Sequence, residues 1–88
     1  MVRKVHVVVK CWRGASKEEW ITLSAAAGMI NVHVSDDPST TALFEVEVNG
    51  ATAAWCVEKA VWIMTAAIGR VPSLRDDAHV SEIPMVLS

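Results

Sequence analysis

The sequence predicts an α+β fold in which a four-stranded antiparallel sheet is covered on one face by two helices. Four short runs alternate between apolar and polar residues, as strands with one buried face do. Two longer segments repeat apolar residues at helical spacing and carry start and stop signals for helices. Clusters of Gly, Asp, Asn and Pro separate these segments, and the resulting order is β-α-β-β-α-β.

The first strand and the first helix are predicted in the N-terminal third of the chain. Residues 3–11 read as a half-buried strand, because alternate positions are apolar. Ser16 and Glu19 have the spacing of a capping box, which predicts a helix from about Lys17 to Ala27 that ends at Gly28. The residues expected on the buried stripe of this helix are Trp20, Leu23, Ser24 and Ala27, flanked by Ile21.

The middle of the chain predicts a β-hairpin. Residues 29–34 and 43–48 both alternate, with isoleucine, valines and phenylalanine on one side and Asn, His or Glu on the other. The connection over 35–41 is rich in Asp, Pro and Ser, which favour turns. The two runs therefore pair as antiparallel strands across a seven-residue loop.

A second helix and a last strand complete the predicted fold. The helix runs from about Thr52 to Ile68 and ends at Gly69, and a polar connection over 70–78 follows it. Residues 79–87 form the last predicted strand. Pro84 lies within it and has no backbone N–H to donate, which places this strand at an edge of the sheet.

The order of these six segments resembles the ferredoxin-like fold, a βαββαβ sandwich. The resemblance is one of topology, covers most of the chain and rests on no family motif. It implies strands arranged 4-1-3-2 in space, with 79–87 at an edge and 3–11 beside 43–48. Because this fold carries many unrelated functions, the resemblance implies no particular activity.

Length and composition favour a small protein that associates. We expect one domain over residues 1–88, since chains divide into several domains only well above this length. A domain of this size has a thin core, yet 52% of the residues are hydrophobic and only 20% are charged. This excess of apolar residues excludes a disordered chain and suggests that a partner covers part of the surface.

The charge and the apolar runs exclude other classes of partner. The formal net charge is −2, whereas nucleic-acid-binding proteins concentrate positive charge, so we expect no nucleic-acid partner. No apolar run approaches the roughly 20 residues that span a membrane, so we expect no membrane partner. The N-terminus reads as a strand rather than a signal peptide, which predicts a cytoplasmic protein. The richness in Ala, Val and Trp is compatible with a high-GC bacterial or phage genome.

The outer side of the second predicted helix carries the most pointed functional signal. Trp55 and Trp62 are seven positions apart, which places them on the same side about 10 Å apart along the helix. Tryptophan is enriched at interface hot spots, so we expect a protein interface there. In the alternative interpretation the helix is rotated and a loop over 69–78 covers one tryptophan. The residues expected at the interface are Trp55, Glu58, Lys59, Trp62, Thr65 and Ala66.

The sheet face opposite the helices is a second candidate surface. We expect Lys4, His6 and Lys10 of the first strand to lie beside acids of the third strand, where opposite charges help to set register. A solvated face, a polar dimer face, a ligand platform and a catalytic His–Glu pair all remain open. Aromatic residues that could stack RNA bases are not expected at the centre of this face. The candidate residues are His6, His33, Glu45 and Glu47.

The segment 11–16 is a candidate anion site. Arg13, Gly14 and Ser16 precede a helix, and a helix N-terminus with an arginine can hold a phosphate or carboxylate. Glu18 and Glu19 in the first turn oppose an anion. Cys11 stands without the second cysteine that copper carriers of similar topology have in this loop, which disfavours copper carriage.

Other signals for chemistry are weak. Cys11 and Cys56 fit no metal or redox spacing, and we expect both as buried free thiols. The acid pairs at 36–37 and 76–77 read as solvated turns, and His79 beside the second pair carries no signal. Nucleotide-binding and nucleophile motifs are missing from the sequence. We therefore expect no catalytic residues, no metal and no cofactor.

The sequence thus predicts a small non-enzymatic interaction module. Its first expected partner is a second copy of itself, as a homodimer or larger oligomer, and a different protein could share the same surface. The contact would use the outer face of the second helix or the open sheet face. Two alternatives stay open: a ligand- or anion-binding regulatory domain that uses the turn Cys11–Ser16, and a small enzyme of the dimeric α+β-barrel type with His6 or His33 as base.

Overall fold

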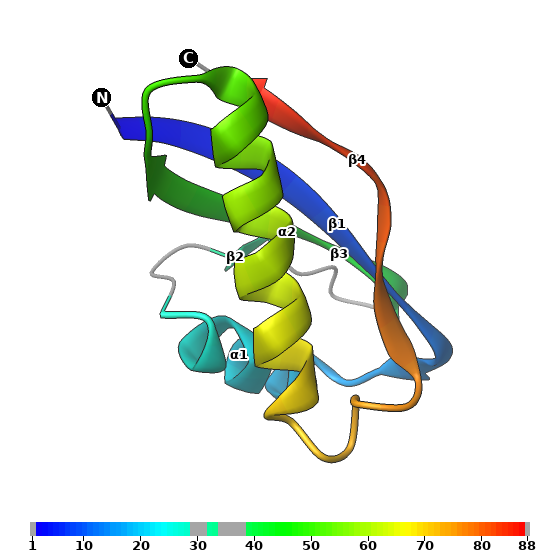
Figure 1. Ribbon diagram of the computed structural model, residues 1–88. Coiled ribbons are helices and arrows are strands. Elements are labelled where there is room, and N and C mark those ends of the chain that lie inside the picture. The colour runs from blue at the N-terminus through cyan, green and yellow to red at the C-terminus, as the bar shows by residue number, and fades with distance from the viewer. Residues whose placement is uncertain (1, 29–31, 34–38, 88) are drawn as a thin grey trace.

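The computed structural model describes the backbone of residues 2–28, 32–33 and 39–87 as one compact α+β domain (Figure 1). Two helices and an antiparallel sheet form its two layers. The elements in chain order are β1 (Val2–Ala15), α1 (Lys17–Ala26), β2 (Val32–His33), β3 (Ser39–Asn49), α2 (Ala53–Gly69) and β4 (Ala78–Leu87).

The sheet consists of three full antiparallel strands, with β1 between β3 and β4. The two-residue segment β2 pairs beside β3, opposite Phe44 and Leu43. The prediction of a four-stranded ferredoxin-like sheet is therefore wrong, because three full strands occur in the part of the chain that is described. Of the predicted strand over 29–34, only Val32–His33 falls within it. Alternation shows that one side of a run is apolar, but the length of strand pairing depends on tertiary contacts.

The placement of the three full strands agrees with two predictions. β1 lies beside β3, with Val5 opposite Val46 and Val7 opposite Phe44. β4 lies at an edge of the sheet, as Pro84 indicated. The register between β1 and β4 shifts between His6 and Val8, and the β4 residues at this irregularity include Pro84. A proline is tolerated at such a position because the ladder there needs no donor.

β1 is longer than the sequence indicated. The strand continues past residue 11 to Ala15, although its alternation stops at Trp12, since Trp12 and Arg13 are both exposed. Pairing supports this extension, because the Trp12 N–H donates to the Asp77 carbonyl at 2.8 Å and Ala15 lies opposite Ser39. The segment 11–16 is therefore the end of a strand and not a strand-to-helix turn. Gly14 marks an irregularity within the strand, since its φ is +79° and the register with β3 shifts between Lys10 and Ala15.

α1 begins and ends as predicted to within one residue. The Glu19 N–H donates to Ser16 Oγ at 3.1 Å, and the Ser16 N–H donates to Glu19 Oε1 at 3.2 Å, which completes the capping box. Ala27 is the C-cap, and Gly28 follows with φ of +73°, a left-handed conformation that favours glycine. Trp20, Leu23 and Ser24 are the buried residues of the helix, Ala27 is partly buried, and Ile21 is exposed.

α2 is a 17-residue helix with Thr52 as its N-cap. It ends one residue later than predicted, since Gly69 is still helical and the Arg70 N–H caps it by donating to the Ala67 carbonyl at 3.0 Å. Among the helices described, none is both long and apolar enough to cross a membrane.

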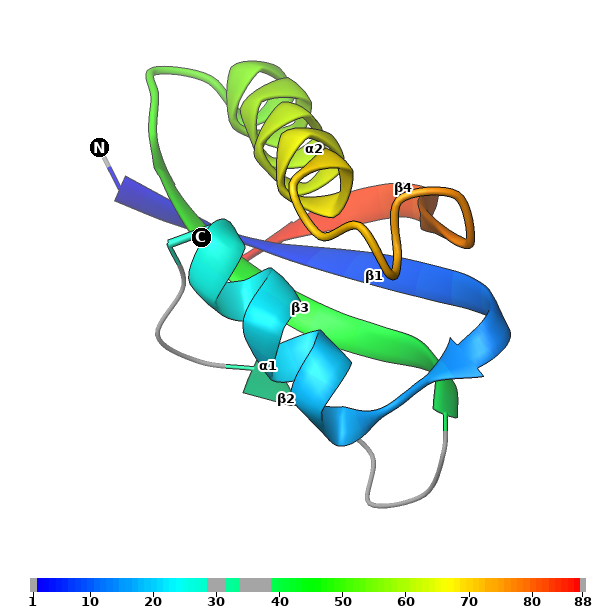
Figure 2. The same ribbon diagram turned by 90° about the horizontal axis from the view of Figure 1, so that it is seen from below.

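Both helices lie on the same face of the sheet, and the core lies between them and the strands (Figure 2). Val5, Val7 and Val9 of β1 are fully buried under this layer. Trp20 of α1 meets Phe44 of β3 edge to face, with ring centroids 6.1 Å apart. The remaining large buried side chains are Leu23, Met64, Leu74, Cys11 and Cys56.

The connection between α2 and β4 is less polar than predicted. Val71 and Leu74 are buried, and both belong to the core. Turns place them there: the Leu74 N–H donates to the Val71 carbonyl at 2.9 Å, and the Ala78 N–H donates to the Leu74 carbonyl at 2.8 Å. A three-residue spacing puts the two side chains on the same side of a helical turn. The sequence interpretation overlooked it because charged and turn-forming residues surround both positions.

The two cysteines are buried and free, as expected. Cys11 lies on the core side of β1, and Cys56 lies on the inner side of α2. The Cys56 thiol is 3.9 Å from the Val48 carbonyl, to which it donates a weak hydrogen bond. Both residues act as small apolar side chains in the core.

Candidate interaction surface

The side of α2 that faces the sheet packs into the core. Its fully buried residues are Cys56, Ala60, Met64, Ala67 and Ile68. Val57, Val61 and Ile63 are half-buried at the margins of this side. Ala53 is exposed, because it occupies the first helical position and precedes the first buried residue of the helix.

The opposite side of α2 carries two exposed tryptophans. Trp55 is 49% exposed and Trp62 is 63% exposed, although tryptophan is a residue that folding normally buries to a large extent. The alternative interpretation, in which the connection after α2 covers one of them, is wrong. That connection turns its apolar residues, Val71 and Leu74, into the core instead.

Lys59 lies between the two tryptophans. Its Nζ atom is 4.4 Å from the centroid of the Trp62 ring and 6.0 Å from that of Trp55. Spacings of three and four residues bring these side chains together on a helix surface. An ammonium group over an indole face is attracted by the negative potential of the ring. The lysine therefore fixes both indoles on the helix surface without covering them.

Two residues before the helix hold Trp55 in place. The Trp55 N–H donates to the hydroxyl oxygen of the N-cap residue Thr52 at 3.1 Å. The indole packs against Gly50, where a Cβ atom would lie 2.3 Å from Trp55 Cδ1. Only glycine allows this close approach, so Gly50 positions the Trp55 ring as well as separating β3 from α2.

The two tryptophans border a shallow hollow of about 320 Å³, lined also by Glu58 and Lys59. Glu58 is exposed and Lys59 is half-buried. The hollow thus combines two apolar rings, one carboxylate and one ammonium group. The other two predicted interface residues are Thr65, which is exposed, and Ala66, which is half-buried. We refer to the six predicted residues together as the tryptophan face.

The open face of the sheet brings together part of the second candidate site. His6 Nε2 is 3.2 Å from Glu45 Oε1, and Lys4 Nζ is 3.9 Å from Glu45 Oε2. Glu47 lies opposite Lys4 in the register but is exposed, and Lys10 lies opposite Thr41 rather than beside an acid. The His33 side chain falls outside the described atoms. The His6–Glu45 pair therefore contributes cross-strand pairing.

The sequence interpretation missed an aromatic pair on the same open face. Trp12 is 75% exposed, and its ring stacks on His79 with centroids 4.7 Å apart and planes at 24°. Trp12 was assigned to a turn, and His79 was given no role. Continuing the alternation of β1 beyond Cys11 would have placed Trp12 on this face beside Lys10.

Arg13 of the candidate anion site is already occupied by the protein itself. Its guanidinium contacts Glu19 Oε2 at 2.5 Å and Asp77 Oδ2 at 3.3 Å. It also donates to the carbonyls of Gly14 at 2.8 Å and Ser73 at 2.6 Å. Through these contacts Arg13 joins the end of β1, the start of α1 and the connection before β4. This arrangement weighs against an anion site.

The charges of this cluster perturb each other. The hydrogen bond from Arg13, with a further one from the Ser16 backbone, lowers the pKa of Glu19 to about 2. The hydrogen bond to Glu19 in turn raises the pKa of Arg13 above its ordinary value. Both groups stay charged under ordinary conditions, and the cluster is a surface ion-pair network that ties three segments together.

The acid pair Asp76–Asp77 shows no arrangement typical of a metal site. Asp77 is engaged by Arg13, and Asp76 is exposed. Asp36 and Asp37 lie outside the described residues. Within residues 2–28, 32–33 and 39–87, no group of three or more His, Cys, Asp or Glu side chains is placed to hold a metal ion.

Comparison with protein-family models, with curated proteins and with solved structures finds no match for this chain.

Proposed function

We propose that the protein is an interaction module that associates with a second copy of itself through the tryptophan face of α2. The observation that carries the proposal is the exposed pair Trp55 and Trp62 with Lys59 held between their rings. Three of the four tryptophans are more than 45% exposed, whereas Trp20 is buried. Burying two indoles in a contact removes much apolar surface from water, which favours association.

The charges on this face support a second copy as the partner. A two-fold contact brings the same patch from both chains together, so the patch must complement itself. Glu58 and Lys59 supply one acid and one base beside the tryptophans. In an antiparallel contact between two α2 helices, Glu58 of each chain faces Lys59 of its partner. Ala54 and Ala66 are small and let the helices approach closely.

A charge exchange tests this arrangement. Glu58→Lys gives a face with two bases, and Lys59→Glu gives a face with two acids. Each variant alone should repel its own copy and stay monomeric, while an equimolar mixture should form a heterodimer by light scattering after size exclusion. Two monomeric variants that fail to associate when mixed would contradict the proposed pairing.

The open sheet face is a second candidate for the contact, favoured by the exposed Trp12 stacked on His79. Two copies could meet there without using α2. Trp12→Glu separates the two candidates: association that is lost in Trp12→Glu and kept in Trp62→Glu would assign the contact to the sheet.

A further inference from the structure

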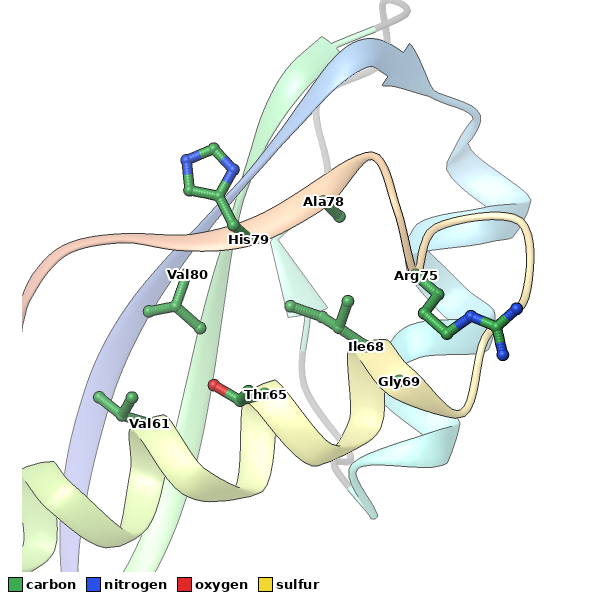
Figure 3. A pocket seen from close by; sticks show the side chains of 8 residues that line it. All are labelled: Val61, Thr65, Ile68, Gly69, Arg75, Ala78, His79 and Val80. Atoms are coloured by element: carbon green, nitrogen blue, oxygen red, sulfur yellow. The ribbon is translucent and has the colours of Figure 1, made fainter.

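A groove separates α2 from the edge strand β4 (Figure 3), and Thr65 is the one residue of the tryptophan face that lines it. Its volume is about 470 Å³. Val61, Thr65 and Ile68 form the helix side, and Ala78 and Val80 form the strand side, while the His79 ring points away from the groove (Figure 3). The lining is mostly apolar, with the Thr65 hydroxyl as one polar group.

Along this groove β4 pairs with β1 on one edge, and its other edge has no partner strand in the described part of the chain. The Trp12 N–H donates to the Asp77 carbonyl, so the polar groups of Asp77 face β1. Successive residues of a strand point these groups to opposite edges, so the N–H and carbonyl of Val80 and the carbonyl of Ala78 face outward. The Ala78 N–H is used, since it donates to the Leu74 carbonyl. In the described part of the chain, no strand lies beyond β4.

One end of the groove is basic and lies at the connection between α2 and β4. Residues 70–77 form this connection and link the Gly69 end of α2 to the start of β4 (Figure 1). Arg75 extends from this connection and lines the groove there (Figure 3). Its side chain is exposed, and no group in the described residues pairs with its guanidinium. An extended chain in the groove would reach this connection beside the Arg75 guanidinium.

We propose that this groove binds the carboxyl-terminal end of an extended peptide from a partner protein. The peptide adds to β4 as an antiparallel strand, a mode in which backbone hydrogen bonds supply affinity and side-chain pockets supply specificity. Its last residue lies opposite Ala78 and its third-last residue opposite Val80. Both side chains then face α2, as Val80 does, and the terminal carboxylate meets Arg75. The ligand class is a peptide with apolar residues at these two positions.

A displayed library of random seven-residue peptides with free carboxyl ends tests the proposal. We expect enrichment of apolar residues at the last and third-last positions. The best peptide, synthesised with a free carboxylate, should bind about tenfold more tightly than its carboxyl amide, since a hydrogen bond to a charged group is lost. Arg75→Gln should bind the two forms equally, whereas Arg70→Gln, a matched exposed variant, should keep the difference.

Two further readouts locate the bound peptide. The amide signal of Val80 should shift in the NMR spectrum and gain protection from hydrogen exchange when the peptide binds. Thr65→Phe fills the groove from an exposed helix position and should abolish binding, while Thr22→Phe on the exposed side of α1 should not. Because Thr65 also belongs to the tryptophan face, both Phe variants are compared in the Trp62→Glu background, which should itself bind the peptide normally. This comparison keeps the test independent of self-association. No enrichment over the unselected library, or equal binding to Thr65→Phe and the natural chain, would overturn the proposal.

Discussion

Lys59 Nζ lies 4.4 Å from the centroid of the Trp62 ring, three residues further along α2. This contact attracts the ammonium group to the indole face while Trp62 stays 63% exposed. It also places a positive charge where a partner's carboxylate can reach it. An ordered indole loses less conformational freedom on binding than a mobile one, so the contact prepares the face for association.

Removing the cation should therefore weaken self-association. In Lys59→Ala the indoles lose their attraction to the ammonium group and the face loses its base. We expect the dimer dissociation constant to rise by about threefold to tenfold, from a cation–π contact and an exposed ion pair of modest strength. Analytical ultracentrifugation over a concentration series measures it. Lys59→Arg keeps both interactions and should remain near the natural value; equal weakening in both variants would show that the cation has no such role.

Gly50 should be intolerant of a side chain. In Gly50→Ala the added Cβ would lie 2.3 Å from Trp55 Cδ1 and 2.9 Å from Cys56 Sγ, so the start of α2 must shift. We expect a loss of about 1–3 kcal/mol in the free energy of unfolding, measured by urea denaturation.

Gly69→Ala is the matched control for this substitution. A Cβ at Gly69 meets no atom within 4 Å, and the residue is helical. Alanine favours a helix over glycine, so this variant should gain up to about 1 kcal/mol. The same sign of change in both variants would contradict the packing of Trp55 on Gly50.

The Arg13–Glu19 pair should make the free energy of unfolding depend on pH in the acidic range. The pKa of Glu19 is about 2 in the folded chain, below the value of about 4.3 for an unfolded glutamate. Its contribution is therefore fully present above about pH 4.3 and is lost as the pH falls toward 2. Urea denaturation at a series of pH values should show this fall in the natural chain.

Glu19→Gln isolates the charge, since glutamine can still accept the Ser16 N–H in a capping box. Its unfolding free energy should fall less steeply between about pH 4.3 and 2 than that of the natural chain. Glu18→Gln, in the same helical turn, should keep the natural slope. Identical slopes in all three chains would show that the pair does not act in solution.

Local signals predicted the helices well and the strand lengths poorly. Ser16, Glu19 and Gly28 act within a few residues of each other, so the limits of α1 could be read from the sequence. The length of β1 depends on hydrogen bonds to Asp77 and pairing with Ser39, which lie far away in the chain.

The candidate sites also differ in whether local sequence spacing could predict them. Periodicity placed Trp55 and Trp62 on the outer side of α2, because a helix fixes the angle between neighbours. Arg13 read as a free anion-binding group, since nothing local indicates that Asp77 and Ser73 surround it. The groove at Val80 depends on how β4 lies against α2, and no sequence pattern shows it.

The most direct test of the tryptophan face is the mass of the particle in solution. Size exclusion with light scattering on the natural chain should give twice the 9.5 kDa of one chain at high concentration. Trp62→Glu should give the single-chain mass, while Ile21→Glu, an equivalent change at an exposed position of α1, should remain dimeric. A natural chain that stays at 9.5 kDa at every concentration, or an unchanged dimer in Trp62→Glu, would contradict self-association through α2.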